Sequence, residues 1–237
     1  MDLAKSFAQH LYTWVTESPN DIFHLALSGG KTPSLLFTVL AEKYSRIMPW
    51  HKIHFWWGDE RMVPPNDAES NFGVVNTLLF SKISVLSEQI HQIHGEANPI
   101  EERDRYGFEI ESQVPAKHGL PEFDLILLGL GEDGHTASIF PNQMQLFESE
   151  NITEIVSHPV SGQQRITLTG QLINNSRRVA FLVSGESKAR VFDKIYHQKE
   201  GSRNYPAARI QTKGDLFWFI DESCLIGNST PQKDQFI

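Results

Sequence analysis

The stretch from Phe123 to Pro141, FDLILLGLGEDGHTASIFP, constrains the fold more than any other part of the chain. Its near-continuous apolar beginning predicts a β-strand that is buried on both faces, as in a parallel sheet covered by helices. The strand ends abruptly in glycines, two acidic residues and His135. Because loops that follow buried strands often carry function, we expect a functional site around His135.

Other apolar runs have the length of buried strands and alternate with segments of helical periodicity. The strand-like runs cover residues 22–27, 52–57, 178–183 and 216–220, and the helical segments include residues 34–44 and 99–114. This alternation predicts an α/β fold with a three-layer, mostly parallel open sheet and helices on both faces. Residues 152–160 and 165–169 could form a small β-hairpin added to this sheet, and residues 136–140 are predicted to begin a short helix.

Polar or glycine-rich turns follow four of the predicted strands. Their sequences are SGGKT at residues 28–32, GDER at 58–61, GEDGH at 131–135 and SGESK at 184–188. We expect GDER to be a charged turn. Because the carboxyl ends of parallel strands lie at one edge of a sheet, the four turns should gather along a single rim, where open α/β sheets bind ligands.

Composition excludes several classes of protein. The chain has 237 residues, with 21 basic against 29 acidic residues, and a net charge of −8 argues against general binding of nucleic acid or anionic membranes. The single cysteine, Cys224, excludes an intramolecular disulfide and fits a reducing cytosol. No apolar run approaches the roughly 20 residues of a membrane span. We expect a cytoplasmic protein that forms one domain over residues 1–237, with a tail at 228–237 that frays.

His135 has two interpretations that the sequence leaves open. It could be a structural histidine bonded to the backbone, or a general base, since the ordinary pKa of histidine lies near neutrality. Asp133 or Glu132 could hold the imidazole in one tautomer or bind substrate hydroxyls; the alternative for both is a carboxylate that caps a turn. The match of residues 129–134 to G-x-G-x-x-G is rejected as a dinucleotide site, because two carboxylates would face the pyrophosphate.

A second group of residues has the chemistry of an anion site. The turn after the first strand offers backbone N–H groups, hydroxyls and a cation at a helix start. Arg61 could hold the same anion with two parallel hydrogen bonds, although an ion pair with Asp59 or Glu60 would also explain it. Lys188 at a helix start opposes the helix dipole, which favours a functional role. The substrate-binding residues predicted for this group are Ser28, Gly29, Gly30, Lys31, Arg61 and Lys188.

Histidine pairs at positions 51 and 54 and at positions 91 and 94 have a spacing seen in metal sites. They lie in strand or loop contexts without an acid at a diagnostic distance, so we predict no metal site. A G-x-S-x-G elbow is also absent from the sequence, which argues against a serine acyl-enzyme.

The segments LALSGGKTP, HFWWGDERMVPPNDAESNFG, FDLILLGLGEDGHTASIFP, RITLT and YPAARI, taken together and in this order, resemble the 6-phosphogluconolactonase family. The resemblance implies the fold of glucosamine-6-phosphate deaminase and a carboxylic ester hydrolase. Its reaction would be hydrolysis of 6-phosphoglucono-δ-lactone to 6-phosphogluconate in the oxidative pentose phosphate pathway, without an organic cofactor or a metal. One departure is Lys31, where the family usually has a small hydroxyl residue.

With this resemblance, the catalytic residues would be His135 and Asp133. His135 would act as base and then as acid. The phosphate would be bound by Arg61, Lys188 and the glycine turn. Sugar hydroxyls would be contacted by Asp59 and Asp133, or these two residues would support the site. The partner would be a phosphorylated sugar lactone, with a monomer or a weak dimer left open. Two alternatives are a deaminase-isomerase acting on glucosamine 6-phosphate and a non-catalytic sugar-phosphate sensor.

Overall fold

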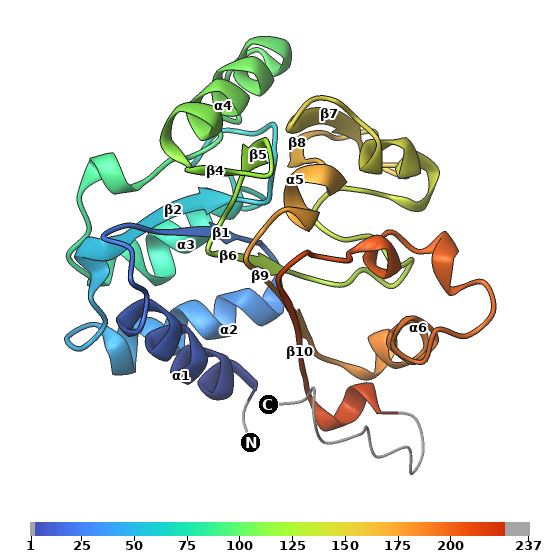
Figure 1. The fold of residues 1–237 in the computed structure, drawn as a ribbon, viewed down its shortest axis with the longest axis horizontal. Helices are drawn as coiled ribbons and strands as arrows, with labels where there is room; N and C mark the ends of the chain where they lie inside the picture. Colours follow the sequence, from blue (N-terminus) through green and yellow to red (C-terminus); the bar gives the residue numbers. More distant parts are fainter. Residues whose placement is uncertain (1–2, 226–237) are drawn as a thin grey trace.

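A sheet of five parallel strands forms the centre of the protein, for which a computed structural model describes residues 3–225 (Figure 1). The strand order is β10-β9-β6-β1-β2. The bounds are Phe23–Leu27 for β1, Ile53–Trp57 for β2, Leu125–Leu128 for β6, Arg178–Val183 for β9 and Asp215–Ile220 for β10. All five strands were expected from their apolar runs, so the prediction of a mostly parallel α/β sheet is confirmed.

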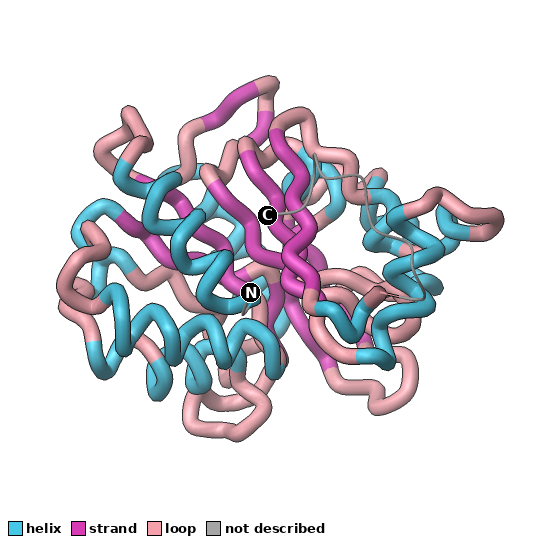
Figure 2. Tube along the Cα trace, turned by 90° about the horizontal axis from the view of Figure 1, so that it is seen from below, coloured by secondary structure: helices cyan, strands magenta, loops and turns pink. Residues whose placement is uncertain are grey.

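Helices cover both faces of this sheet. On one face α1 packs against α2 and β10, and on the other lie α4 and α5 (Figure 1). Figure 2 shows the same arrangement from below, with helices in front of the strands. The helices are α1 (Leu3–Thr16), α2 (Lys31–Val39), α3 (Asn71–Leu78), α4 (Pro99–Gln113), α5 (Gly170–Asn174) and α6 (Glu186–Tyr196). One turn of π-helix, η1 (Leu40–Tyr44), continues α2.

Short elements complete the described part of the chain. The 3-10 segments are η2 (Trp50–Lys52), η3 (Phe80–Lys82), η4 (Ser87–Gln89), η5 (Pro141–Phe147), η6 (Ser202–Asn204), η7 (Pro206–Arg209) and η8 (Glu222–Cys224). A two-stranded hairpin joins β4 (Ala116–Lys117) to β5 (Leu120–Pro121). None of the described helices is long and apolar enough to cross a membrane. The predicted frayed tail at 228–237 lies outside the described residues.

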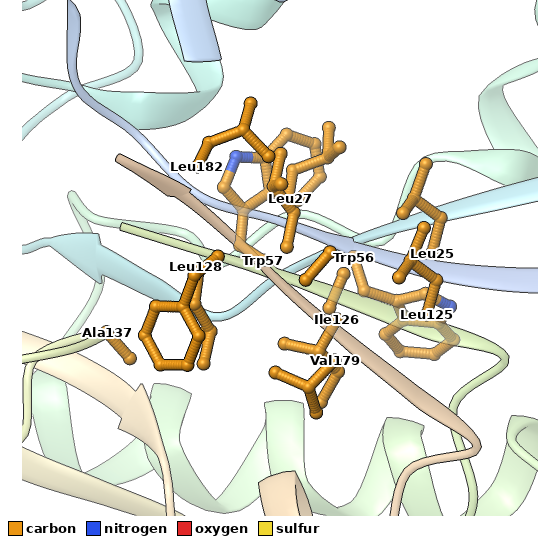
Figure 3. Packing of buried hydrophobic residues seen from close by; sticks show 14 of the residues in the cluster. Leu25, Leu27, Trp56, Trp57, Leu125, Ile126, Leu128, Ala137, Val179 and Leu182 are labelled. Carbon is orange, nitrogen blue, oxygen red and sulfur yellow. The ribbon is translucent and has the colours of Figure 1, made fainter. Parts of the chain in front are cut away.

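The core lies on both sides of the central strands. Every residue of β1 and of β6 is buried. Figure 3 shows side chains such as Leu27 and Leu182 on one side of the strands and Ile126 and Val179 on the other. Burial on both faces explains why these strands are continuously apolar instead of alternating. The loops at their carboxyl ends are therefore mounted on a rigid scaffold.

The predicted hairpin forms, but it does not join the central sheet. β7 (Thr153–Ser157) and β8 (Gln164–Leu168) pair with each other, and β8 pairs with β3 (Asp59–Arg61) in a separate antiparallel sheet. The prediction that GDER is a turn was therefore wrong for its last three residues. A charged three-residue segment has no strand signal of its own; its partner lies about a hundred residues away, and tertiary pairing decides its conformation.

The predicted helix at residues 136–140 was also wrong. Thr136 and Ile139 form a tight turn with a β-bridge, and Ala137 between them has a positive φ of 47°. Phe140 is extended, with φ −93° and ψ 160°, because the following Pro141 disfavours a helical conformation at the residue before it. A 3-10 segment begins only at Pro141, and it is kinked at Gln143.

Two buried histidines, His24 and His91, and the half-buried His54 link β1, β2 and α4. His54 Nδ1 lies 2.9 Å from His91 Nε2, and His91 Nδ1 lies 2.6 Å from Glu109 Oε1. Trp56 Nε1–H donates to His24 Nδ1 at 3.2 Å, and His24 is buried. Burial, followed by the nearby His54 and His91, lowers the pKa of His24 to about 4. Among the described residues, no group of three or more potential ligands could hold a metal ion.

This cluster should make the fold sensitive to acid. His24 is neutral in the folded protein, and its pKa is 6.5 in the absence of the fold, so its stabilisation is complete above pH 6.5 and is lost as the pH falls towards 4. Between pH 7.5 and pH 5 the loss from His24 should be about 2 kcal/mol. We expect His24→Gln, which keeps an acceptor for Trp56, to lose correspondingly less stability over this range in urea unfolding.

The matched control for this experiment is His51→Gln, which makes the same substitution at an exposed histidine. Its pH dependence should equal that of the wild type. If His24→Gln and the wild type lost the same free energy of unfolding between pH 7.5 and pH 5, His24 would not be the source of the acid sensitivity.

Candidate active site

One cavity of about 600 Å³ lies where the four predicted turns meet. It is bounded by the segments that follow β1, β2, β6 and β9, as parallel strand topology requires. The predicted site residues that line it are Ser28, Gly29, Gly30, Lys31, Asp59, Arg61, His135 and Lys188. Asp133 is not part of the lining and lies behind His135, within hydrogen-bonding distance of its ring.

The imidazole of His135 is held by Asp133. His135 Nδ1 lies 2.6 Å from Asp133 Oδ1, and the same oxygen accepts the backbone N–H of His135 at 3.1 Å. Burial alone would raise the pKa of Asp133, but these contacts with His135 lower it below its ordinary value. An ionised carboxylate can only accept, so Nδ1 carries the proton and Nε2 is left as a proton acceptor. This is the tautomer that a general base requires.

Two glycines of the loop make this geometry possible. A Cβ on Gly131 would lie 2.1 Å from His135 Nδ1, so any side chain there would displace the ring. Gly134 has φ 80°, and a Cβ there would lie 2.3 Å from Tyr205. Its carbonyl accepts the backbone N–H of Ala207 at 3.0 Å, so the YPAARI segment packs against the histidine loop. The two glycines thus allow the position of the His135 ring and the packing of its loop. They do not need a dinucleotide site to explain them.

The turn after β1 is shaped to start a helix beside the cavity. α2 begins at Lys31, three residues earlier than expected, and its N-cap Gly30 has φ 107°. A Cβ on Gly29 would lie 1.8 Å from Asn71 Oδ1, and Asn71 Nδ2 donates to the carbonyl of Asp59 at 2.8 Å. The hydroxyls of Thr32 and Ser184 lie 2.6 Å apart and connect this turn to the one after β9. The N-termini of α2 and α6 therefore border the same cavity.

Arg165, which the sequence analysis did not select, lies beside Arg61. The two arginines are directly opposite each other in the β3–β8 pair, and both line the cavity. Like charges in this position destabilise a sheet. Burial, together with Arg61, lowers the pKa of Arg165 despite the opposing effect of Asp59. The Nε atoms of both arginines are buried without a hydrogen-bond partner among the described residues. An anion in the cavity would relieve this conflict.

The acidic neighbours of Arg61 do not neutralise it. Its guanidinium donates to the backbone carbonyl of Glu69. Glu60 is buried and accepts the backbone N–H groups of Arg61, Asn71 and Phe72, so its carboxylate holds the start of α3. Burial raises the pKa of Glu60 in spite of these hydrogen bonds. The ion pair considered for Arg61 is thus not formed with Glu60.

One carboxylate oxygen of Asp59 is engaged with neighbouring side chains. Ser138 Oγ donates to its Oδ2 at 2.5 Å, and Arg165 approaches the same oxygen at 3.9 Å. Arg165 also donates to Ser138 Oγ at 3.3 Å. These contacts favour support of Arg165 over contact with sugar hydroxyls.

The arrangement defines a class of α/β proteins with a cavity at the carboxyl edge of a parallel sheet, lined by basic side chains and by the histidine of a histidine–aspartate pair. A model of the family described as glucosamine-6-phosphate isomerases/6-phosphogluconolactonase matches residues 1–218. A 6-phosphogluconolactonase from Haemophilus influenzae is 46% identical over 208 residues, which cover 87% of this chain and 88% of that one. The chain belongs to the 6-phosphogluconolactonase family.

Solved structures agree with this assignment. The 6-phosphogluconolactonase of Thermotoga maritima superposes with a TM-score of 0.82 at 29% identity, covering 93% of this chain and 95% of that one. A monomeric glucosamine-6-phosphate deaminase has the same fold, with a TM-score of 0.76 at 22% identity over 94% of each chain. The fold expected from the resemblance is therefore present, and it is shared by both kinds of enzyme.

Proposed function

We propose that the chain hydrolyses 6-phosphoglucono-1,5-lactone to 6-phosphogluconate, with His135 as the general base that activates water. The observation that carries this proposal is that one cavity is lined both by a histidine paired with an aspartate and by three cationic side chains. His135 lines the cavity with its acceptor nitrogen set by Asp133. Arg61, Arg165 and Lys188 line the same cavity. A phosphorylated lactone has an electrophilic carbonyl at one end and a dianion at the other, which matches a base and a group of cations in one cavity.

In this mechanism, Nε2 of His135 takes a proton from a water molecule while the oxygen of that water attacks C1 of the lactone. The tetrahedral intermediate collapses when the bond between C1 and the ring oxygen breaks. The imidazolium then gives its proton to that oxygen, which becomes the C5 hydroxyl, and the new carboxylic acid ionises. Asp133 stabilises the charged imidazolium between the two steps. A δ-lactone already hydrolyses unaided, so a positioned water and one base suffice without a covalent nucleophile.

The phosphate would add negative charge beside Arg61 and Arg165, whose mutual repulsion is only partly offset by Asp59. Arginine binds phosphate through two parallel N–H groups, and both side chains line the cavity. The start of α2 adds backbone N–H groups and a favourable dipole. Ser28, Gly29, Gly30 and Lys31 form this start, and Lys188 lies at the start of α6. Anchoring the phosphate fixes the distance from C1 to His135.

A deaminase-isomerase acting on glucosamine 6-phosphate is the second candidate, because a deaminase shares the fold. Two assays on the same preparation distinguish the candidates. We expect saturable acceleration of the hydrolysis of freshly generated 6-phosphogluconolactone, corrected for the spontaneous rate, and no release of ammonia from glucosamine 6-phosphate. Ammonia release without lactone hydrolysis would reject the proposed function in favour of the deaminase.

A further inference from the structure

Glu132 and Lys188 face each other within the cavity from two different segments. Glu132 lies in the loop after β6, and Lys188 lies in the first turn of α6. Glu132 Oε1 is 3.5 Å from Lys188 Nζ, and the Glu132 side chain is 66% exposed. A hydrogen bond from Ser187 and the charge of Lys188 lower the pKa of Glu132. Of the two acids beside His135, only Asp133 contacts the imidazole, so Glu132 has a separate role.

The start of α6 is a favourable place for negative charge. Its first turn contains Glu186, and Asp221 accepts the backbone N–H of the N-cap residue Gly185 at 3.1 Å. Of these acids only Glu132, from the neighbouring loop, lies in the cavity lining, and it is the one that contacts Lys188. Its carboxylate therefore lies beside a cation to which a phosphate would bind.

We propose that the carboxylate of Glu132 competes with the substrate phosphate for binding to Lys188 and the start of α6. The inference rests on the proposed function, in which Lys188 is one of the cations that bind phosphate. The pair is exposed, and exposed ion pairs change an equilibrium by at most about fivefold. A phosphate dianion can thus displace the monovalent carboxylate. Since the product keeps the phosphate, return of Glu132 to Lys188 also favours product release.

The direction in which KM changes when Glu132 is replaced separates this role from its alternatives. If Glu132 competes with phosphate, Glu132→Gln tightens the binding of phosphate and lowers KM. If Glu132 instead binds a sugar hydroxyl, or holds Lys188 in a productive position, the same substitution weakens substrate binding and raises KM. The matched control is Glu186→Gln, which removes an exposed acid from the same first turn and outside the cavity lining.

The experiment is calorimetric titration of inorganic phosphate into the wild type, Glu132→Gln and Glu186→Gln at low ionic strength, with KM measured for the phosphorylated lactone. We expect Glu132→Gln to bind phosphate about three- to fivefold more tightly, with a parallel fall in KM. Glu186→Gln should change either value by less than about twofold.

Unchanged or weaker phosphate binding by Glu132→Gln would overturn the proposal, as would failure of all three proteins to bind phosphate. If the variant bound phosphate more tightly but the protein did not hydrolyse the lactone, the competition by Glu132 would be supported and the proposed function would be rejected. The competition by Glu132 and the proposed function can therefore be rejected independently.

Discussion

Replacing His135 with glutamine should lower kcat for lactone hydrolysis by about 10³-fold, within the usual range for a general acid–base residue. Glutamine can still donate to Asp133, so the loop should keep its shape, but its amide cannot accept a proton from water. KM should change little, because the proposed phosphate contacts are made by other side chains of the cavity. The measurement is steady-state hydrolysis of 6-phosphogluconolactone corrected for the spontaneous rate.

His158→Gln is the control for this substitution. Both histidines pack against Phe140, with ring centroids 4.9 Å away for His135 and 5.0 Å for His158. His158 does not line the cavity, and its Nδ1 accepts the backbone N–H groups of Val160 and Ser161. We expect near-normal turnover for His158→Gln. Near-normal turnover for His135→Gln would rule out His135 as the base.

Replacing Arg165 with alanine should lower kcat/KM for the phosphorylated lactone by about 10²-fold, as expected from the loss of charge-assisted hydrogen bonds to phosphate. Arg165 also lies over the ring of Phe140, at 5.8 Å, which places it close to the packing that supports His135. A purely structural role would reduce turnover of any lactone. Loss of a phosphate contact should reduce turnover of the phosphorylated lactone alone.

The comparison therefore needs unphosphorylated 1,5-gluconolactone as a second substrate and Arg190→Ala as a charge control. Arg190 is exposed on α6 and outside the cavity lining. We expect Arg165→Ala to be impaired with the phosphorylated lactone and unchanged with the other, and Arg190→Ala to be normal with both. Equal losses on both lactones would assign Arg165 to the support of the fold.

The convergence of four turns at one rim could be predicted because it depends on local patterns. Buried strands are visible as apolar runs, and parallel topology then places their carboxyl ends together. The sequence left open whether Asp133 or Glu132 contacts His135. Only the path of the loop around Gly131 decides which acid reaches the ring. The sequence identified both candidate acids, but it did not show which of them contacts the imidazole.

Arg165 could not be found from local patterns. Its position opposite Arg61 depends on the register between β3 and β8, which are separated by about a hundred residues. The available signal was an arginine opening the RITLT strand, but arginine at the edge of a strand is usually solvated. The same non-local pairing turned the predicted GDER turn into a strand. Both errors have one cause. When two antiparallel strands are far apart in the sequence, neither segment alone shows that they pair or in which register.

The ratio of kcat/KM for 6-phosphogluconolactone to kcat/KM for unphosphorylated 1,5-gluconolactone, measured on the wild type, tests the proposed roles of the cavity residues most directly. Arg61, Arg165 and Lys188 line the cavity together with His135. If the three cations bind the phosphate while His135 acts on C1, the ratio should be at least about 10³, the combined effect of several charge-assisted contacts. A ratio near one would show that the three cations do not bind the phosphate and would contradict the proposed function.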